Sequence, residues 1–161
     1  MEFNLIKMYC YILMNFRDLE SNDYYKNYLY LLEQLTEVNV EQITFEKFFN
    51  FVNNLNCNHR IIVLEEDNKI VASGSLLIEN KIIHGISKVG HIEDIVVDKN
   101  VRGKGLGKNI INYLNEIGKL NNCYKIILNC KESNIKFYEN CGFENKEFEM
   151  VKYYKKNNNK N

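Results

Sequence analysis

The sequence predicts an α/β fold with a mixed central sheet flanked by helices, antiparallel in its first half and crossing over through helices in its second. Its 161 residues, 45% hydrophobic and 26% charged, suit one globular domain with its own core. Two apolar runs meet at Asp67-Asn68, a dipeptide that favours a β-hairpin. Further along, apolar runs alternate with amphipathic helical patterns, which is typical of strands joined by crossover helices.

The first half of the chain is predicted to run strand, helix, helix, strand, strand. The first strand covers residues 8–16, and Asp23 opens a helix that continues to Leu35. Thr44 is the expected N-cap of the second helix. Strands follow at residues 60–66 and 69–79. The apolar positions assigned to the core are Tyr24, Tyr28, Leu31, Leu32 and Leu35 in the first helix, and Phe45, Phe48, Phe49, Val52 and Leu55 in the second.

The second half is predicted to alternate strands and helices. Residues 81–88 are a connection or an edge extension before a central apolar strand at residues 90–97, and a long helix begins after a glycine-rich turn. A strand at residues 124–130 and a short helix at residues 133–140 follow, with Gly142 as the helix-ending glycine. Residues 148–154 form the last strand. One domain is expected over residues 1–154, and residues 155–161 form a disordered polar tail.

Charge and cysteine usage exclude several classes of protein. Lys plus Arg and Asp plus Glu both total 21, so net charge gives no reason to expect a nucleic acid or a membrane as partner. The five cysteines are an odd number without a C-x-x-C pair, which argues against a disulfide framework and against a zinc site. We expect small buried thiols in a reducing compartment, a cytoplasmic protein, and no metal. The apolar stretch at residues 9–16 is too short to span a bilayer.

The glycine-rich turn between the central strand and the long helix is the main candidate binding site. Residues 102–107 read Arg-Gly-Lys-Gly-Leu-Gly. Closely spaced glycines let a ligand approach the backbone, and the N–H groups at a helix start favour an anion. Arg102, Lys104 and Lys108 add positive charge. The spacing fits neither a P-loop nor a dinucleotide fingerprint. It fits Arg-x-x-Gly-x-Gly, a pyrophosphate-binding loop, although such a turn can also serve only to start a helix.

This loop and the order of the elements resemble the GNAT N-acyltransferases, whose Arg-x-x-Gly-x-Gly loop holds the pyrophosphate of acyl-CoA. Within that superfamily the chain resembles the glucosamine-6-phosphate N-acetyltransferases over roughly residues 31–150. The stretches that carry the likeness are Leu-Thr-Glu at 35–37, Ile-Ile-His at 82–84, GHIEDI at 90–95, the loop at 102–108, CYKIIL at 123–128, Phe-Tyr-Glu at 137–139 and Cys-Gly-Phe at 141–143.

The resemblance implies acetyl transfer from acetyl-CoA to the 2-amine of D-glucosamine 6-phosphate, on the route to UDP-N-acetylglucosamine. It implies direct attack of the amine on the thioester without an acyl-enzyme. It also implies a homodimer with a shared active site, because the family's last strand crosses to a second subunit.

The resemblance also assigns residues to the donor. The backbone of Val97 is expected to pair with the pantetheine arm, and Asn134 to contact CoA. Tyr138 falls at the position near the CoA sulfur, which makes it the candidate donor to the leaving thiolate. The resemblance implies that the pyrophosphate is bound by the loop residues Arg102, Gly103, Lys104, Gly105, Leu106, Gly107 and Lys108.

On the acceptor side, Glu93 and Asp94 match the pair that binds the sugar hydroxyls and the amine region. The carbonyl of Asn129 matches the group that helps orient the amine. Residues near the sugar phosphate are Thr36, Lys81 and Lys125. The family's C-terminal arginine is missing, since no arginine follows Arg102, and Lys152 is the nearest cation, one position early. A shift of one residue on a strand turns a side chain to the other face.

Other interpretations remain open at this point. From spacing alone, Tyr138 is a core aromatic residue whose hydroxyl bonds to a backbone carbonyl. A carboxylate pair inside an apolar strand needs buried partners, which favours function for Glu93 and Asp94. His84 and His91 are taken as structural groups. The alternatives for the whole chain are a GNAT enzyme for another amine, such as a polyamine or a protein N-terminus, and a non-catalytic acyl-CoA-binding module.

Overall fold

The computed structural model describes residues 15–154. These residues divide into two compact units, residues 15–128 and residues 129–154, which are described separately. Most of the predicted first strand, residues 8–14, and the predicted tail, residues 155–161, lie outside the described residues.

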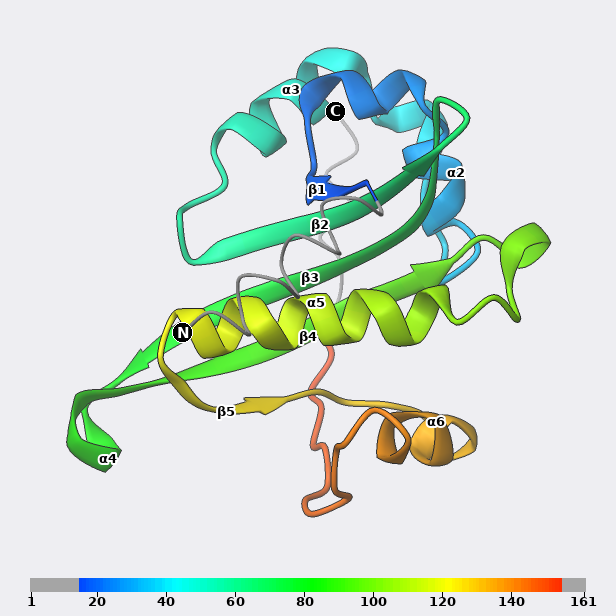
Figure 1. Ribbon diagram of the computed structural model, residues 1–161. Helices are drawn as coiled ribbons and strands as arrows, with labels where there is room; N and C mark the ends of the chain where they lie inside the picture. Colours follow the sequence, from blue (N-terminus) through cyan, green and yellow to red (C-terminus); the bar gives the residue numbers. More distant parts are fainter. Residues whose placement is uncertain (1–14, 155–161) are drawn as a thin grey trace. The chain divides into compact units, whose positions relative to one another are not determined.

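The first unit contains a five-stranded sheet with the strand order β1-β2-β3-β4-β5 (Figure 1). The strands are β1 (Phe16–Asp18), β2 (His59–Glu66), β3 (Lys69–Lys81), β4 (Ser87–Val97) and β5 (Cys123–Ile127). The first three neighbouring pairs are antiparallel, and β4 pairs with β5 in parallel. This arrangement confirms the predicted mixed sheet with a helical crossover in its second half.

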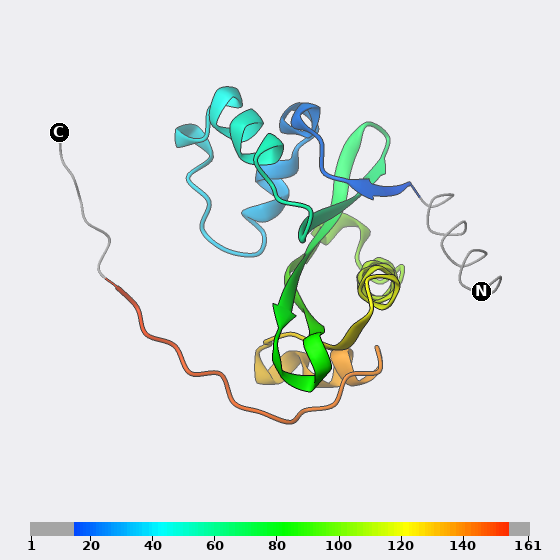
Figure 2. The same ribbon diagram turned by 90° about the vertical axis from the view of Figure 1, so that its left-hand side faces the viewer.

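Helices cover both faces of this sheet (Figure 2). The crossover helix α5 (Leu106–Leu120) lies on one face, and its buried residues include Ile110 and Leu114. The helices α2 (Tyr28–Leu32) and α3 (Phe45–Asn53) lie on the other face, where Leu31 and Phe48 join one apolar cluster with strand residues. Each helix thus buries an apolar stripe against a sheet face, as its spacing predicted.

The N-terminal helical region differs from the prediction. The single helix expected from Asp23 is divided into a 3₁₀ turn, η1 (Ser21–Tyr25), and the short α2, because Asn27 between them has a left-handed φ of 67°. The carboxylate of Asp23 is fully buried and accepts two hydrogen bonds from Arg17, each of 2.7 Å. This ion pair fastens η1 to β1.

Two local signals in the sequence are confirmed. Thr44 caps α3, since its hydroxyl accepts the backbone N–H of Lys47 at 3.3 Å. Asp67 and Asn68 form the β2–β3 hairpin turn with left-handed φ values of 49° and 60°. The connection between β3 and β4 is a tight turn at α4 (Ile83–Ile86), in which Gly85 has a φ of 73°.

Strand β4 departs from regular geometry at Asp94. Ser73 on β3 stands opposite Val96, but Ser75 stands opposite Glu93, so β4 carries one extra residue. This β-bulge gives Asp94 a left-handed φ of 53°. It also turns Ile95 towards β3, where a Cβ on residue 74 would overlap Cδ1 of Ile95. A larger residue at position 74 would therefore require the Ile95 side chain to move.

The second unit contains two short helical pieces and an extended end. The 3₁₀ turn η4 (Glu132–Asn134) leads into α6 (Ile135–Glu139). Gly142, with a φ of 90°, ends the helix as predicted, and the N–H of Phe143 bonds back to the carbonyl of Tyr138 at 3.1 Å. The strand predicted at residues 148–154 is wrong for this chain, since these residues have no regular secondary structure. A strand needs a neighbouring strand for its hydrogen bonds, and the described residues supply none here.

Candidate active site

The glycine-rich loop follows β4 and leads directly into α5. Asp98 opens the 3₁₀ turn η3 (Lys99–Val101), and its carboxylate accepts the N–H of Asn100 at 2.8 Å. Gly103 and Gly105 then take φ values of 84° and 79°, which L side chains rarely adopt. No heavy atom lies within 4 Å of a Cβ built on either glycine, so open space faces the backbone there.

The loop has the properties that an anion site needs. Arg102, Lys104 and Lys108 are exposed around it, and α5 begins at Leu106 directly behind the glycines. The first N–H groups of a helix lack partners within the helix and point towards its N-terminal end. The residues from 102 to 108 therefore fit a pyrophosphate, with open space for it in front of Gly103 and Gly105.

Beside this loop, strand β4 has an open edge. Its parallel pairing with β5 runs from Lys88 to His91, and in the described part of the chain no strand pairs with residues 92–97 on that side. The carbonyl of Val97 accepts a hydrogen bond of 3.0 Å from Nε of Arg102. An extended ligand that pairs here like an added strand would meet backbone groups of β4, with Arg102 held at its end.

The two carboxylates of the central strand lie on this bulged segment. Both Glu93 and Asp94 are exposed, so the expectation of a buried carboxylate pair is wrong. Asp94 lies within the bulge, whereas Glu93 keeps its regular position opposite Ser75. Asp94 occupies a left-handed backbone conformation that is uncommon outside glycine and costs about 1–3 kcal/mol. Such strain at a polar residue next to an open strand edge is typical of functional sites.

Tyr28 of α2 lies in the core, as its spacing predicted. Its hydroxyl also responds to the charge of Asp94, which the spacing could not predict. Burial raises the pKa of the Tyr28 hydroxyl to about 12, its hydrogen bond with Ser73 opposes this, and the charge of Asp94 raises the pKa further. The phenol is therefore neutral near pH 7. No apolar spacing rule distinguishes such a tyrosine from a phenylalanine.

The predicted phosphate ligands of the first unit lie at separate places. Thr36 is exposed just after α2, and Lys125 of β5 lies over the ring of Tyr124 at 5.8 Å. Lys81 bonds to Glu79 at 2.5 Å. Nε2 of His91 lies 3.0 Å from the same carboxylate, and these two partners, Lys81 first, lower the pKa of Glu79. The structural role expected of His91 agrees with this contact.

The second unit holds the remaining predicted residues. Asn134 is exposed at the start of α6, and Asn129 is exposed ahead of η4. Tyr138 is half-buried, with ring contacts to Phe137 at 5.1 Å and Phe143 at 6.2 Å between centroids. Lys152 lies 5.6 Å from the ring of Tyr154. The Tyr138 ring is thus fixed by aromatic neighbours on α6 and after it.

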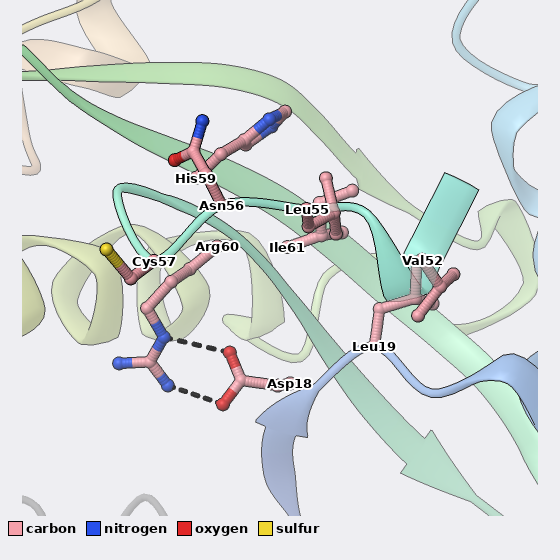
Figure 3. Close-up of a pocket in the computed structure, with 9 residues that line it drawn as sticks. All are labelled: Asp18, Leu19, Val52, Leu55, Asn56, Cys57, His59, Arg60 and Ile61. Atoms are coloured by element: carbon pink, nitrogen blue, oxygen red, sulfur yellow. Dashed lines mark hydrogen bonds and ion pairs between the residues drawn. The ribbon is translucent and has the colours of Figure 1, made fainter. Parts of the chain in front are cut away.

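A pocket of about 330 Å³ lies elsewhere in the first unit, between β1, β2 and the end of α3 (Figure 3). None of the predicted site residues lines it. Its lining is mixed, with apolar side chains beside polar ones, and the guanidinium of Arg60 makes two hydrogen bonds to the carboxylate of Asp18, at 2.8 and 2.6 Å. The remaining lining residues are Leu19, Val52, Leu55, Asn56, Cys57, His59 and Ile61.

The cysteines within residues 15–154 differ in burial. Cys57 and Cys130 are exposed, so the expectation of buried thiols is wrong for them, and Cys10 lies outside the described residues. Cys123 is partly buried, and burial raises the pKa of its thiol. Within residues 15–154 no group of three or more His, Cys, Asp or Glu side chains could hold a metal ion. No helix among them is long and apolar enough to cross a membrane.

Comparison with known proteins identifies the class of enzyme. Residues 15–143 match the Acetyltransferase (GNAT) family, and the chain belongs to this family of acyltransferases. It is 46% identical over 142 residues to glucosamine 6-phosphate N-acetyltransferase 1 of Dictyostelium discoideum, a match that covers 87% of this chain and 90% of that protein. The enzyme of the same name from Arabidopsis thaliana is 43% identical, with 86% of this chain and 95% of that protein covered.

A solved structure gives the same grouping. The crystal structure of glucosamine-6-phosphate N-acetyltransferase from Arabidopsis thaliana superimposes with a TM-score of 0.81 at 42% identity, covering 87% of this chain and 97% of that chain. Within the GNAT family, the chain therefore groups with the glucosamine 6-phosphate N-acetyltransferases.

Proposed function

We propose that this enzyme transfers the acetyl group of acetyl-CoA to the 2-amine of D-glucosamine 6-phosphate, giving N-acetyl-D-glucosamine 6-phosphate and CoA in the cytoplasm. One observation carries the proposal: the anion loop at residues 102–108 lies next to an open strand edge that bears the strained Asp94. Relatives 46% and 43% identical to this chain bear the name of that enzyme.

The donor is held by the first unit in this proposal. The pyrophosphate lies against the N–H groups of the glycine loop and α5, with Arg102, Lys104 and Lys108 around it. The pantetheine arm runs along the open edge of β4 and pairs with the backbone of Val97 as an added strand would. Asn134 contributes a further contact to CoA. The thioester is thereby brought to the bulge at Asp94.

The chemistry is direct attack. The neutral 2-amine forms a bond to the thioester carbon, the nitrogen gives a proton to water, and the C–S bond then breaks to release the CoA thiolate. Asp94, with Glu93, holds the amine and the neighbouring hydroxyl, and the carbonyl of Asn129 orients the amine. Backbone N–H groups on the open edge of β4 donate to the carbonyl oxygen as it gains charge. Tyr138 donates its hydroxyl proton to the leaving thiolate and takes a proton back from water.

The sugar phosphate is bound by several weaker contacts rather than by one arginine. Within one subunit Thr36 lies near Lys99, whereas Lys81 and Lys125 lie towards the α4 end of the sheet. The proposed ligands are therefore Thr36 of one subunit with Lys81, Lys125 and Lys152 of the other. Lysine is a point charge on a flexible stem and lacks the bidentate fork of arginine. Lys152 reaches this site from a second subunit, because residues 148–154 are extended, rich in exposed apolar side chains and without a strand partner in the described chain. The enzyme is then a homodimer with a shared site.

The experiment that tests the proposal measures release of free thiol from acetyl-CoA with three acceptors in parallel. We expect rapid release with glucosamine 6-phosphate, slower release with glucosamine because the phosphate contacts are lost, and background release with spermidine. A spermidine rate that equals or exceeds the rate with glucosamine 6-phosphate would reassign the acceptor to another amine. Acetyl-CoA binding without release with any amine would indicate a binding module.

A further inference from the structure

One side chain connects the loop after β4 to a distant part of the sequence. Oε1 of Gln34 accepts the backbone N–H of Lys99 at 2.9 Å, across 65 positions of sequence. Lys99 is the first residue of η3, and the first N–H groups of a helical turn lack partners within the turn. Asp98 satisfies the next of these groups, the N–H of Asn100. Gln34 thus completes the capping of η3 from outside it.

The two ends of this hydrogen bond lie beside the two proposed substrate sites. On one side, η3 leads directly into Arg102, whose Nε bonds to the carbonyl of Val97, and into the glycine loop. On the other side, Gln34 precedes the exposed Thr36 by two residues, in the segment that leaves α2. Gln34 itself is half-buried. The remaining hydrogen bonds of residues 97–101 come from β3 or from the loop itself, such as the one between the N–H of Asp98 and the carbonyl of Val71.

We propose that Gln34 is a positioning residue that couples the acetyl-CoA loop to the acceptor segment at Thr36. This inference rests on the proposed function for the identity of the two substrates. Acetyl-CoA orders the loop behind Arg102, the ordered loop presents the Lys99 N–H in a fixed direction, and Gln34 holds the start of the Thr36 segment against it. Because coupling between two binding sites is reciprocal, the acceptor strengthens acetyl-CoA binding by the same factor.

The test compares three variants with the wild-type enzyme. Gln34→Met keeps the length of the side chain and removes the acceptor oxygen. Gln34→Glu restores an acceptor oxygen. Gln42→Met makes the same change at an exposed glutamine of η2 (Val40–Gln42) and is the matched control. Calorimetry measures the Kd of acetyl-CoA alone, and then the Kd of glucosamine 6-phosphate with and without CoA, so that no turnover occurs. Amide exchange of Lys99 by NMR reports the hydrogen bond itself.

The expected result follows from the size of one hydrogen bond. Gln34→Met should lose protection of the Lys99 amide, weaken acetyl-CoA about two- to tenfold and reduce the effect of CoA on acceptor affinity by a similar factor. Gln34→Glu should regain the protection, and Gln42→Met should behave as wild type. A Gln34→Met enzyme that loses the protection but keeps both affinities and their coupling would overturn the proposal, and so would unchanged protection.

These outcomes are separable from a failure of the proposed function. If the wild-type enzyme releases no thiol with glucosamine 6-phosphate, the proposed acceptor is wrong. The Lys99 exchange rate and the Kd of acetyl-CoA alone would still decide whether Gln34 positions the loop.

Discussion

Two regions of the chain differ in how their backbone is held. One is the stretch at residues 98–107, which leads into the glycine-rich loop, and the other is the C-terminal segment at residues 148–154. The loop is held by hydrogen bonds that start and end within the first unit, including those between Asn100 and Asp98 and between Arg102 and Val97. The segment has no regular secondary structure, although its side chains are large and apolar: Phe148 is 99% exposed, Met150 95% and Tyr153 88%.

This difference indicates that the two substrates are bound by parts of the chain with different degrees of local support. A donor shared by a whole family can be bound by a self-contained loop at a helix start. The proposal assigns the acceptor phosphate partly to a segment that has no strand partner among residues 15–154. We therefore expect donor binding, chemistry and phosphate recognition to respond separately to mutation.

The largest effect is expected at the bulge, where we propose that the amine is held. Asp94→Ala should lower kcat about a thousandfold, because general acid–base and positioning groups typically contribute about two to four powers of ten. The Kd of acetyl-CoA should stay unchanged. The matched control is Asp67→Ala, an exposed aspartate of the β2–β3 turn with a similar left-handed φ of 49°. Thiol release at the wild-type rate from the Asp94→Ala enzyme would show that the carboxylate is not part of the acceptor site.

The next effect concerns the leaving group. Tyr138→Phe removes one hydroxyl and keeps the ring that packs on Phe137 and Phe143. We expect kcat to fall about a hundredfold with little change in the KM for acetyl-CoA, since the hydroxyl is needed only as the thiolate forms. Tyr25→Phe, at a 70% exposed tyrosine, is the control. If single-turnover rates of the Tyr138→Phe enzyme match the wild type, Tyr138 is a packing residue.

A smaller effect is expected in the self-contained loop. Gly105→Asn keeps a residue type that tolerates left-handed backbone, but its side chain fills the space in front of the glycine. Acetyl-CoA should bind about tenfold more weakly, which corresponds to about 1.4 kcal/mol, and the melting temperature should change little. Gly85→Asn, at a turn glycine with a φ of 73° and equally open surroundings, should leave the affinity unaltered. Calorimetric titration measures the Kd of acetyl-CoA for both variants. If the Gly105→Asn enzyme binds acetyl-CoA as tightly as the wild type, the pyrophosphate does not bind at this loop.

The smallest effect should arise in the C-terminal segment. Lys152→Ala removes one of several phosphate contacts and should raise the KM for glucosamine 6-phosphate about two- to threefold with an unchanged kcat, within the range of a single exposed charge pair. Lys146→Ala, at an exposed lysine paired with Glu144, is the control in the same unit. Light scattering should give the mass of a dimer, and a fully active monomer would contradict the shared site.

Much of the fold could be predicted because its signals are local. Asp67-Asn68 has the turn preference that a hairpin needs, and Thr44 and Gly142 occupy the cap positions that these residue types favour. The glycine loop was predictable for the same reason, since its backbone conformation depends on residues within six positions of one another. The left-handed φ of Gly105 is an example.

The features that the sequence concealed depend on distant neighbours. The bulge that exposes Asp94 arises from how β4 pairs with β3 around Gly74, and no pattern within β4 announces it. The break at Asn27 interrupts a helical spacing that otherwise continues. The predicted strand at residues 148–154 has the right residues for a strand, but pairing is decided by a neighbour that the sequence of one chain does not specify.

The open edge of β4 also bears on how the protein behaves in storage. Unpaired N–H and C=O groups along a strand can pair with another polypeptide as readily as with a ligand, and such edges promote aggregation. Glu93 and Asp94 place two exposed charges on this edge, which opposes stacking of identical chains. At the other end of the edge, Nε of Arg102 occupies the carbonyl of Val97, which leaves the stretch between them without a charged side chain. A preparation emptied of CoA should accordingly be more prone to precipitate than one saturated with it, and Asp94→Ala should worsen this tendency.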